Sequence, residues 1–444
     1  MPACTNCKAV ANGVTDRHTD PMTTFSCADD FDPEALPPAT ARQRILATLR
    51  PLPGQQCTAL RDALNRVLAE DIHSPFNVPS HATATMDGYA LRAADLPDGA
   101  GRTLQVIGKV FAGDSFQGHI GANQCVRIMT GAPLPTGADA VVMQEYCEPL
   151  PADQVRIQAN HRSGHRRNLR QAGASIGRGQ TVITAGRRLT AADLGVIASL
   201  GMGEVRVRRR PKVAFLSTGN ELQAVGRPLQ PGQVDDSNRY TLYGMLRRLH
   251  CEIADLGVVR DDPRRLRAAL QDAAAQADVV ITSGGVSVGE ADYTREVLSD
   301  LGSVNFWKIA LKPGRPLTFG HLGTAPDTTW FFGLPGNPVS VMVTFYQLVQ
   351  PALQTLAGLT PSAPLTLTAR LTTPLAKQPG RLELQRGILQ QDTDGALTVR
   401  GTGDQESGTL LSMSQANCLI MLAQDSTGAA AGEQVTVQPF CDFI

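Results

Sequence analysis

The sequence predicts a multidomain α/β plus β protein, with a doubly wound α/β domain, a β-rich insert, a helical hinge region and a C-terminal β domain. Its 444 residues are about three times a typical domain, so several cores are expected. Between residues 206 and 357, short apolar runs alternate with helical patterns, which is typical of a doubly wound sheet. Residues 75–173 and 358–444 instead show short alternating segments between Gly- and Pro-rich turns, which predicts β structure.

The composition narrows the class of protein. Hydrophobic residues make up 42% and charged residues 18% of the chain, as expected for a globular protein. The formal net charge is zero, which argues against nucleic-acid and membrane-surface binding. No apolar run reaches the roughly 18 residues of a membrane span, and no signal-peptide pattern opens the chain. Nine scattered cysteines then favour reduced thiols and a cytoplasmic location.

Residues 1–38 are polar and lack a sustained period, so we expect a largely disordered extension. Cys4 and Cys7 form a CxxC pair there, with His18 and Cys27 nearby. A zinc site would need four ligands at suitable spacing. The favoured interpretation is an extension without a metal, and zinc binding is the alternative.

The expected hinge or dimer region comprises residues 39–74 and 174–205. Helical patterns cover Ala39–Leu49, Thr58–Leu68 and Ala191–Leu200, as the spacing of apolar residues indicates. The β-rich insert between them has short strand patterns at Val106–Val110, Cys125–Met129 and Ala140–Gln144.

In the α/β domain, buried-strand patterns alternate with helices. The strands are expected at Val213–Ser217, Glu252–Val259, Asp278–Ile281 and Trp330–Leu334. The helices are expected at Arg239–His250, from the cap Asp262-Pro263 through Ala274, at Ala291–Leu301, and from the cap Asn337-Pro338 to about Ala357. Asp before Pro is a strong helix start.

The loops that follow these strands should form the ligand site, because ligands of open α/β sheets bind beyond the carboxyl ends of the strands. The loop from Thr282 to Tyr293 is rich in glycine and serine and precedes a helix, which suits a phosphate cradle. A tight structural turn is the alternative. The candidate substrate-binding residues of the strand exits are Ser217, Thr218, Gly219, Ser283, Gly284, Gly285, Ser287 and Pro335.

Three acidic residues, Glu221, Asp261 and Asp292, leave different strands at the same predicted edge. Hard oxygen ligands beside a phosphate site suggest Mg²⁺. The alternative for each is a helix cap or a solvated loop charge.

Lys308, Lys312 and Arg315 bring cations to this edge, and Pro313, Gly314 and Pro316 shape their loop. Fixed cations suit an oxyanion, although a solvated basic loop is the alternative.

These motifs, in this order, resemble the molybdopterin molybdenumtransferase family, called MoeA in bacteria and forming the E domain of gephyrin in animals. The resemblance covers roughly residues 40–444. It rests on the motifs Met86–Ala90, Arg127–Pro133, Ser217–Glu221, Ser283–Tyr293, Lys312–Gly314, Gly333–Pro338 and Gly380-Arg381.

The resemblance implies an elongated homodimer whose α/β domain binds molybdopterin, with a site shared between subunits. Asp87 and Thr130 of one subunit would face Glu221, Asp261 and Asp292 of the other. Arg386 and Ser407 would contribute to molybdate binding, beside Lys308, Lys312 and Arg315.

The implied reaction joins molybdate to adenylated molybdopterin and releases AMP, with Mg²⁺ as cofactor. The resemblance also suggests a molybdopterin adenylyltransferase and molybdoenzyme chaperones as partners. Departures from the family pattern include Ala174 and Ser175 where an acidic pair is usual, and Asn220 and Arg315 in their loops. The alternatives are a molybdopterin adenylyltransferase-like enzyme and a catalytically weak paralogue that acts as a scaffold.

Overall fold

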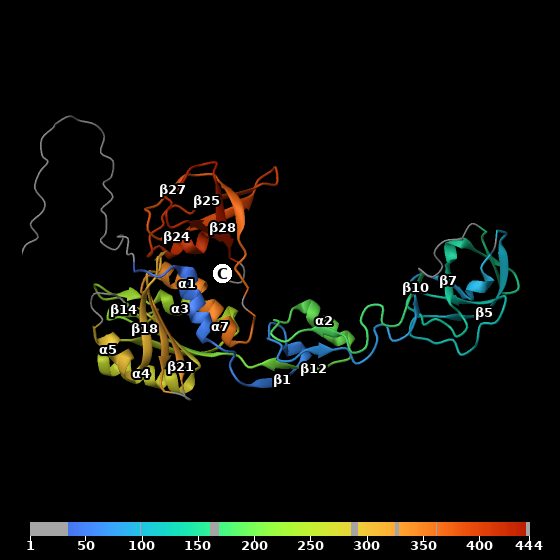
Figure 1. Ribbon diagram of the computed structural model, residues 1–444, viewed down its shortest axis with the longest axis horizontal. Coiled ribbons are helices and arrows are strands. Elements are labelled where there is room, and N and C mark those ends of the chain that lie inside the picture. Colours follow the sequence, from blue (N-terminus) through green and yellow to red (C-terminus); the bar gives the residue numbers. More distant parts are fainter. Residues whose placement is uncertain are drawn as a thin grey trace, which may run out of the picture.

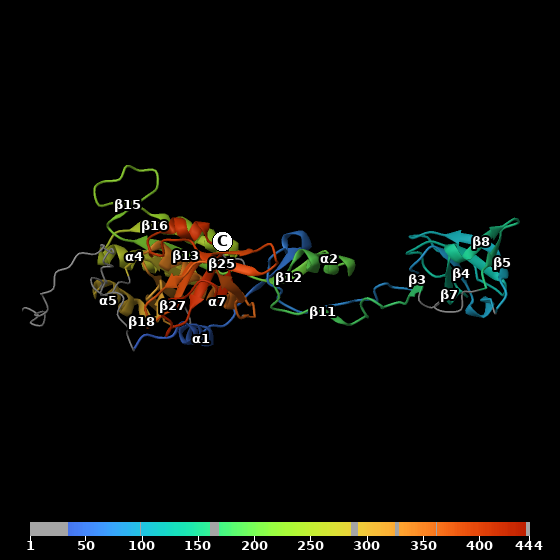
Figure 2. The ribbon, with the colours of Figure 1, turned by 90° about the horizontal axis from the view of Figure 1, so that it is seen from above.

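The computed structural model describes residues 34–97, 99–159, 168–285, 292–324, 328–360 and 362–440, with the side chains of residues 292 and 293 left out. The expectations for residues 1–33, including the CxxC pair, lie outside these ranges. The described residues form an elongated molecule, with the α/β domain and the C-terminal β domain at one end and the β-rich unit at the other (Figures 1 and 2). A smaller hinge unit lies between them.

The α/β domain is built on a sheet with strand order β16-β13-β17-β21-β20-β18. The first four strands of this order run parallel, whereas β20 is antiparallel to both of its neighbours. The doubly wound sheet is therefore mixed, because the antiparallel strand β20 joins β18 to β21 at one edge. The strands are β13 (Lys212–Thr218), β16 (Glu252–Val259), β17 (Val279–Ser283), β18 (Gly302–Lys308), β20 (Pro316–Leu322) and β21 (Thr329–Leu334).

Helices cover both faces of this sheet, which confirms the doubly wound class. Apolar residues of α3, of the α6 to α7 helix and of α1 pack on one face, and those of α4 and α5 pack on the other. The helices are α1 (Pro38–Thr48), α3 (Ser237–Arg248), α4 (Pro263–Gln276), α5 (Asp292–Leu301), α6 (Pro338–Thr344), a π-helical turn η6 (Phe345–Val349) and α7 (Gln350–Leu356).

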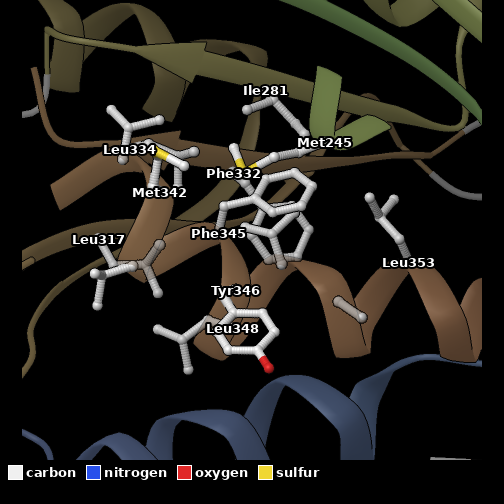
Figure 3. Close-up of a cluster of buried hydrophobic side chains, with 14 of the residues drawn as sticks. Met245, Ile281, Leu317, Phe332, Leu334, Met342, Phe345, Tyr346, Leu348 and Leu353 are labelled. Atoms are coloured by element: carbon white, nitrogen blue, oxygen red, sulfur yellow. The ribbon is translucent and has the colours of Figure 1, made fainter. Parts of the chain in front are cut away.

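The larger core lies between the sheet and the helix α6 to α7 (Figure 3). Phe332 of β21 and Phe345 of the π-helical turn are both fully buried, and Met245 of α3 closes one side. The only two tryptophans of the chain, Trp307 and Trp330, pack against this core. Tryptophan fluorescence therefore reports on the packing of this domain alone.

Most predicted elements of this domain are confirmed within a few residues. Asp262 caps α4 by accepting a hydrogen bond from the amide of Arg265 at 2.8 Å. Asn337 does not cap α6 through its side chain, because its amide nitrogen donates to Ser407 Oγ instead.

The hinge unit shows two departures from the prediction. The segment predicted as a helix over Thr58–Leu68 instead contains the last two residues of β1, which pairs with β12, and a single 3-10 turn at Leu60–Asp62. Asn65 has φ of 63°, which a continuing α-helix cannot contain. Helix α1, assigned by sequence to the hinge, buries Ala41 and Ile45 in the core of the α/β domain.

A separate apolar cluster holds the hinge unit together, with Leu68, Ile197 and Val207 fully buried. Helix α2 starts with a capping box between Thr190 and Asp193, which confirms the predicted helix. The elements are β1 (Gln55–Ala59), η2 (Leu60–Asp62), β2 (Ile72–His73), β11 (Thr181–Ile183), α2 (Ala191–Ser199) and β12 (Glu204–Arg208).

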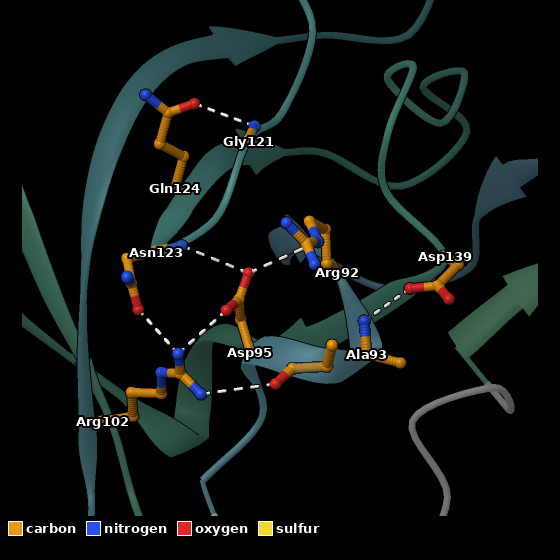
Figure 4. A network of polar contacts seen from close by, with 9 residues as sticks. Arg92, Ala93, Asp95, Arg102, Gly121, Asn123, Gln124 and Asp139 are labelled. Carbon is orange, nitrogen blue, oxygen red and sulfur yellow. Dashed lines mark hydrogen bonds and ion pairs between the residues drawn. The ribbon is translucent and has the colours of Figure 1, made fainter.

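The β-rich unit has a sheet of order β7-β4-β6-β5-β9-β8. Buried Asp95 secures one end of it by accepting hydrogen bonds from Arg102 and from the amide of Asn123 (Figure 4). The elements are β3 (Thr83–Ala84), β4 (Gly88–Leu91), η3 (Ala93–Asp95), β5 (Arg102–Val110), β6 (Gln124–Ile128), β7 (Ala140–Met143), η4 (Gln144–Tyr146), β8 (Cys147–Leu150), β9 (Gln154–Ile157) and β10 (Leu169–Arg170).

The C-terminal β domain is a closed barrel, because β24 pairs with both β25 and β26 in a sheet of order β19-β24-β25-β22-β28-β26. Strand β19 belongs by sequence to the α/β domain, so it joins the two domains. The elements are β19 (Leu311–Lys312), β22 (Leu367–Leu371), β23 (Leu375–Ala376), β24 (Leu382–Gln391), β25 (Leu397–Gly401), α8 (Leu410–Gln415), β26 (Cys418–Leu422), β27 (Gly428–Ala429) and β28 (Gln434–Pro439).

The placement of α1 can be tested through the two tryptophans. Ile45 is fully buried, so Ile45→Ala should lower the free energy of unfolding of the α/β domain by about 2–5 kcal/mol. Urea unfolding followed by tryptophan fluorescence measures this change.

Arg44→Ala is the matched control, because Arg44 is exposed on the same helix and should change stability by less than about 0.5 kcal/mol. Equal fluorescence transitions for the two variants would show that α1 does not stabilise this domain.

Candidate active site

The carboxyl ends of the parallel strands meet at one edge of the α/β sheet. Ser217 of β13 pairs with Ser283 of β17, and Ser283 pairs in turn with Leu334 of β21. On the other side, Thr218 pairs with Val259 of β16. This register places the loops that follow these strands next to one another, as the sequence predicted.

Ser217 is fully buried and donates a hydrogen bond to Asp236 Oδ1 at 3.0 Å. The Asp236 carboxylate also accepts from the amide of Arg239 and so caps α3. Its burial raises the pKa of Asp236 above the ordinary value. Ser217, predicted as a substrate-binding residue, therefore has its hydroxyl hydrogen-bonded inside the protein.

Ser283 is buried in the same way, with an exposed fraction of 1%. Its hydroxyl accepts a hydrogen bond from Asn238 Nδ2 at 2.8 Å, and the same nitrogen donates to Gly336 O at 2.7 Å. Asn238 thus ties the exit of β17 to the turn after β21, where Pro335 is buried. The serine side chains support the loops and do not line a surface.

Asp236 and Asn238 are site residues that the sequence reasoning missed. A signal was present, since Asp235-Asp236-Ser237-Asn238 is a run of capping residues before the predicted helix. Among the described residues, Asp236 Oδ2 and Asn238 Oδ1 are buried without a hydrogen-bond partner.

Glycine is required where the strand exits approach one another. Gly284 and Gly285 have φ of 88° and 69°, a region that favours glycine. A Cβ on Gly284 would lie 2.5 Å from Thr218 O, and one on Gly285 would lie 2.7 Å from Thr218 Oγ1. Thr218 Oγ1 is buried, and no described residue hydrogen-bonds to it. Ser287 lies outside the described residues.

Two of the three predicted metal ligands lie on adjoining loops. The amide of Asn220 donates to Asp261 Oδ2 at 3.2 Å, and Asn220 Oδ1 accepts from the amide of Asp261 at 3.3 Å. Glu221 follows directly, and both acids are exposed. A Cβ on Gly219 would lie 2.6 Å from Glu221 Oε2, so glycine leaves room for this carboxylate.

Asp292 is the first residue of α5, but its side chain lies outside the described part of the chain. Within the described residues, no group of three histidine, cysteine or acidic side chains is arranged to hold a metal ion. The carboxylates of Glu221 and Asp261 suit a hard cation by their chemistry.

The predicted cations follow β18 at the same edge. Lys308 is exposed at the end of β18, and Arg315 is half-buried just before β20. Lys312 lies on β19, where its Nζ is 3.7 Å from Oε2 of Glu383 in the C-terminal barrel. Glu383 is buried, so this ion pair holds the lysine between the two domains.

Ser407 of the barrel also reaches this edge. Its Oγ accepts from Asn337 Nδ2 at 2.8 Å, and its carbonyl oxygen accepts from the amide of Val339 at 3.1 Å. The loop that carries Ser407 therefore packs against the start of α6, beside the turn containing Pro335.

Arg386 is placed differently from the prediction. It is 1% exposed and donates to the carbonyl oxygens of Asp404, Gln405 and Glu406 and to Ser412 Oγ. Burial lowers its pKa to about 10. Arg386, predicted to contribute to molybdate binding, is thus buried here, and its guanidinium group shapes the loop that presents Ser407.

Asp87 and Thr130 form a compact pair in the β-rich unit. Asp87 Oδ1 accepts from both the amide and the hydroxyl of Thr130, each at 2.8 Å. These hydrogen bonds lower the pKa of Asp87, so its carboxylate stays ionised at neutral pH. The β-rich unit that carries this pair lies at the opposite end of the molecule from the α/β domain (Figure 2), so within one chain the pair is remote from the strand exits.

Comparisons with known proteins cover nearly the whole chain. Residues 36–201 match "MoeA N-terminal region (domain I and II)", residues 214–355 match "Probable molybdopterin binding domain" and residues 368–440 match "MoeA C-terminal region (domain IV)". A molybdopterin molybdenumtransferase of Haemophilus influenzae is 46% identical over 90% of this chain and 97% of that protein. The chain belongs to the molybdopterin molybdenumtransferase family.

Two further similarities agree with this family assignment. The gephyrin of Dictyostelium discoideum is 32% identical over 84% of this chain and 58% of that protein. The crystal structure of the molybdopterin biosynthesis MoeA protein from Pyrococcus horikoshii OT3 superposes with a TM-score of 0.79 at 27% identity, covering 91% of this chain and all of that one. This family member has, in its described ranges, no helix with the length and apolarity of a membrane span.

The supporting role of Arg386 gives a stability prediction. Arg386→Ala leaves buried carbonyl groups without donors, so the barrel should lose roughly 3 kcal/mol or more of unfolding free energy. Hydrogen exchange of residues 404–407 should then be much faster than in the unmodified protein.

Arg400→Ala is the matched control, since Arg400 is exposed on β25 of the same barrel. An Arg386→Ala protein of normal stability that needed far more molybdate would restore the originally predicted direct contact.

Proposed function

We propose that this chain is the transferase that inserts molybdate into adenylated molybdopterin and releases AMP, the last step in forming the molybdenum cofactor. The observation that supports this most is the convergence of glycine-lined strand exits, exposed acids and lysines at one sheet edge, in a chain 46% identical to a molybdopterin molybdenumtransferase. AMP release from adenylated molybdopterin and molybdate by the purified protein tests it directly.

The phosphate groups of the substrate should bind at the exits of β13 and β17. Gly284 and Gly285 let the exit of β17 lie directly against Thr218, whose buried Oγ1 lacks a described partner. Backbone amides and a hydroxyl in such a loop suit phosphate oxygens. Lys308, Lys312 and Arg315 would offset the negative charge of phosphate and molybdate at the same edge.

Ser407 and Lys312 are the best-placed residues for holding molybdate at the border of the two domains. Lys312 is anchored by Glu383 and Ser407 by Asn337, so both are positioned before substrate arrives. Positions held in advance reduce the ordering needed during the reaction.

Mg²⁺ is the proposed cofactor, with Glu221, Asp261 and Asp292 as its ligands. Bound there, it would neutralise charge that develops on the phosphate oxygens when the anhydride is cleaved. Glu221 and Asp261 reach adjoining loops, which supports the first two ligands, and Asp292 starts the helix that follows the glycine-rich loop.

The proposed assembly is a homodimer in which the β-rich unit of one subunit faces the α/β domain of the other. The elongated shape supports this, because the β-rich unit with Asp87 and Thr130 lies at the far end of the molecule from the α/β domain of its own chain. The ionised carboxylate of Asp87, held by Thr130, would hydrogen-bond to a group of the bound substrate or accept a proton from it. We further propose a cytoplasmic location, and a molybdopterin adenylyltransferase and molybdoenzyme chaperones as partners before and after this step.

A molybdopterin adenylyltransferase-like activity is the second candidate, since the α/β domain alone matches a molybdopterin-binding family. The contacts of Lys312 and Asn337 with the barrel disfavour it, because they tie the site to a second domain.

Asp292→Asn should test the metal assignment. It keeps size but removes charge, so activity should fall by about a hundredfold, or roughly 2.7 kcal/mol of barrier. Raising the Mg²⁺ concentration should recover part of the rate, because mass action offsets weaker binding.

Asp272→Asn on the exposed side of α4 is the control and should leave AMP release unchanged. Full activity of Asp292→Asn at low Mg²⁺ would assign the metal to Glu221 and Asp261 alone.

Mixing two inactive variants should test the shared site. In a dimer of one Asp87→Asn chain and one Glu221→Gln chain, one of the two sites combines an intact α/β domain with an intact β-rich unit. Random subunit exchange should therefore restore roughly a quarter of the activity.

A double variant carrying both changes on one chain, mixed with itself, is the control and should stay inactive. No recovery in the mixture, despite exchange confirmed by native mass spectrometry, would place Asp87 in the site of its own chain or outside any site.

A further inference from the structure

A cluster of arginines lies where the hinge unit joins the α/β domain, and the proposed function does not use it. Its members are Arg66, Arg188, Arg208, Arg210 and Arg247, called here the junction cluster. Backbone contacts of Val67, the residue after Arg66, bring Arg66, Arg188 and Arg208 close together. Val67 forms a β-bridge with Arg188, and the carbonyl oxygen of Val67 accepts a hydrogen bond from the amide of Arg208.

The cluster is partly buried. Arg66 is 6% exposed and donates from Nη2 to the carbonyl oxygen of Arg208 at 2.9 Å. The Nε atoms of Arg208 and Arg210 are buried, and no described residue accepts a hydrogen bond from either. Buried donors without partners are rare in folded proteins, so a further acceptor is expected at this place.

Nearby acids leave most of this charge uncompensated. Asp278 is taken by Arg209, which donates to both of its oxygens at 2.7 Å, and Glu70 pairs with Arg206 at 3.5 Å. In the described ranges, no member of the junction cluster forms an ion pair.

The pKa of His250 is also affected by the positive charge of the junction cluster. The hydrogen bond from its amide to Arg247 O places it at the end of α3, beside the cluster. Burial lowers its pKa, and the charges of Arg188, Arg210, Arg247 and Arg66 lower it further. Burial and the charge of Arg210 lower the pKa of Arg66, and among the described residues Glu252 is the one acid that raises it, so positive charge exceeds negative charge here.

A small cavity lies beside the cluster, and Arg188 is the one cluster member that lines it. Its other lining residues are the polar Asn65 and Gln354 and the apolar Val67, Leu249, Leu353, Ala357 and Leu359. Arg208 crosses the same junction, since a Cβ on Gly358 would lie 3.3 Å from its Nε. We propose that the junction cluster is a binding site for a tetrahedral oxyanion of the phosphate type. Guanidinium groups match the oxygens of such anions with paired, charge-assisted hydrogen bonds.

This site is separate from the candidate active site. The cluster lies by the amino-terminal ends of β13 and β16, where the amide of Glu252 donates to Pro211 O. The strand exits with Ser217 and Ser283 are at the opposite edge of the sheet. A bound anion would link the hinge unit to the α/β domain and would not take part in the reaction.

Calorimetric titration of the full chain with phosphate, sulfate and molybdate, at constant ionic strength set by chloride, tests the proposal. Phosphate-type binding should weaken by about tenfold or more in Arg188→Gln and in Arg210→Gln. Arg178→Gln, at an exposed arginine outside the cluster, is the matched control and should bind as the unmodified protein does. Arg247→Gln, on the exposed end of α3, provides a third variant should the two half-buried changes impair folding.

Competition among the three anions identifies which anion the cluster prefers, because the anion that binds most tightly displaces the other two. Binding that survives both substitutions but is lost in Lys312→Ala would place the anion in the active site and overturn the proposal. Absence of binding, with a change in oligomeric state in Arg188→Gln measured by light scattering, would overturn it in favour of a carboxylate from a second copy.

Discussion

The in-register parallel pairing of β13 with β16 and β17, and of β17 with β21, is the constraint on which the site depends. Because these strands end at the same level, loops far apart in sequence come within hydrogen-bond distance. Asn238, Ser283 and Gly336 are joined in this way by one side-chain amide. A register shift of one residue would reverse the faces of every side chain in a strand, so the site and the core are set by the same pairing.

The C-terminal barrel completes this edge from the side. Strand β19 leaves the α/β domain to pair with β24, which carries Lys312 to the buried Glu383. A second connection runs from buried Arg386 through the loop 404–407 to Asn337. The barrel therefore positions Lys312 and Ser407, the two residues proposed to hold molybdate. A loss of barrel stability should disturb both residues at the edge of the α/β sheet.

The β-rich unit, unlike the barrel, lies too far from the sheet edge to contribute to the site of its own chain. Asp87 and Thr130 are hydrogen-bonded to each other, yet the hinge unit lies between the β-rich unit that carries them and the α/β domain. A chain that keeps such a pair at a remote end can use it only through another subunit or a large motion. The proposed homodimer uses the pair through the other subunit, because this arrangement needs no movement of the hinge unit.

The sequence by itself determined the fold class, the helices and four of the six sheet strands of the α/β domain, and the loops at its candidate edge, since these follow from local periodicity, capping residues and motifs. Only the tertiary structure decided that Ser217, Ser283 and Arg386 are buried supports, that α1 packs on the α/β core, and that β18 and β20 make the sheet mixed. Burial depends on partners far away in sequence: Ser217 is covered because Asp236 approaches it, and Arg386 because the loop 404–407 folds over it. Sequence periodicity depends only on residues that are close along the chain. It contains no information about the distant residues that folding brings into contact.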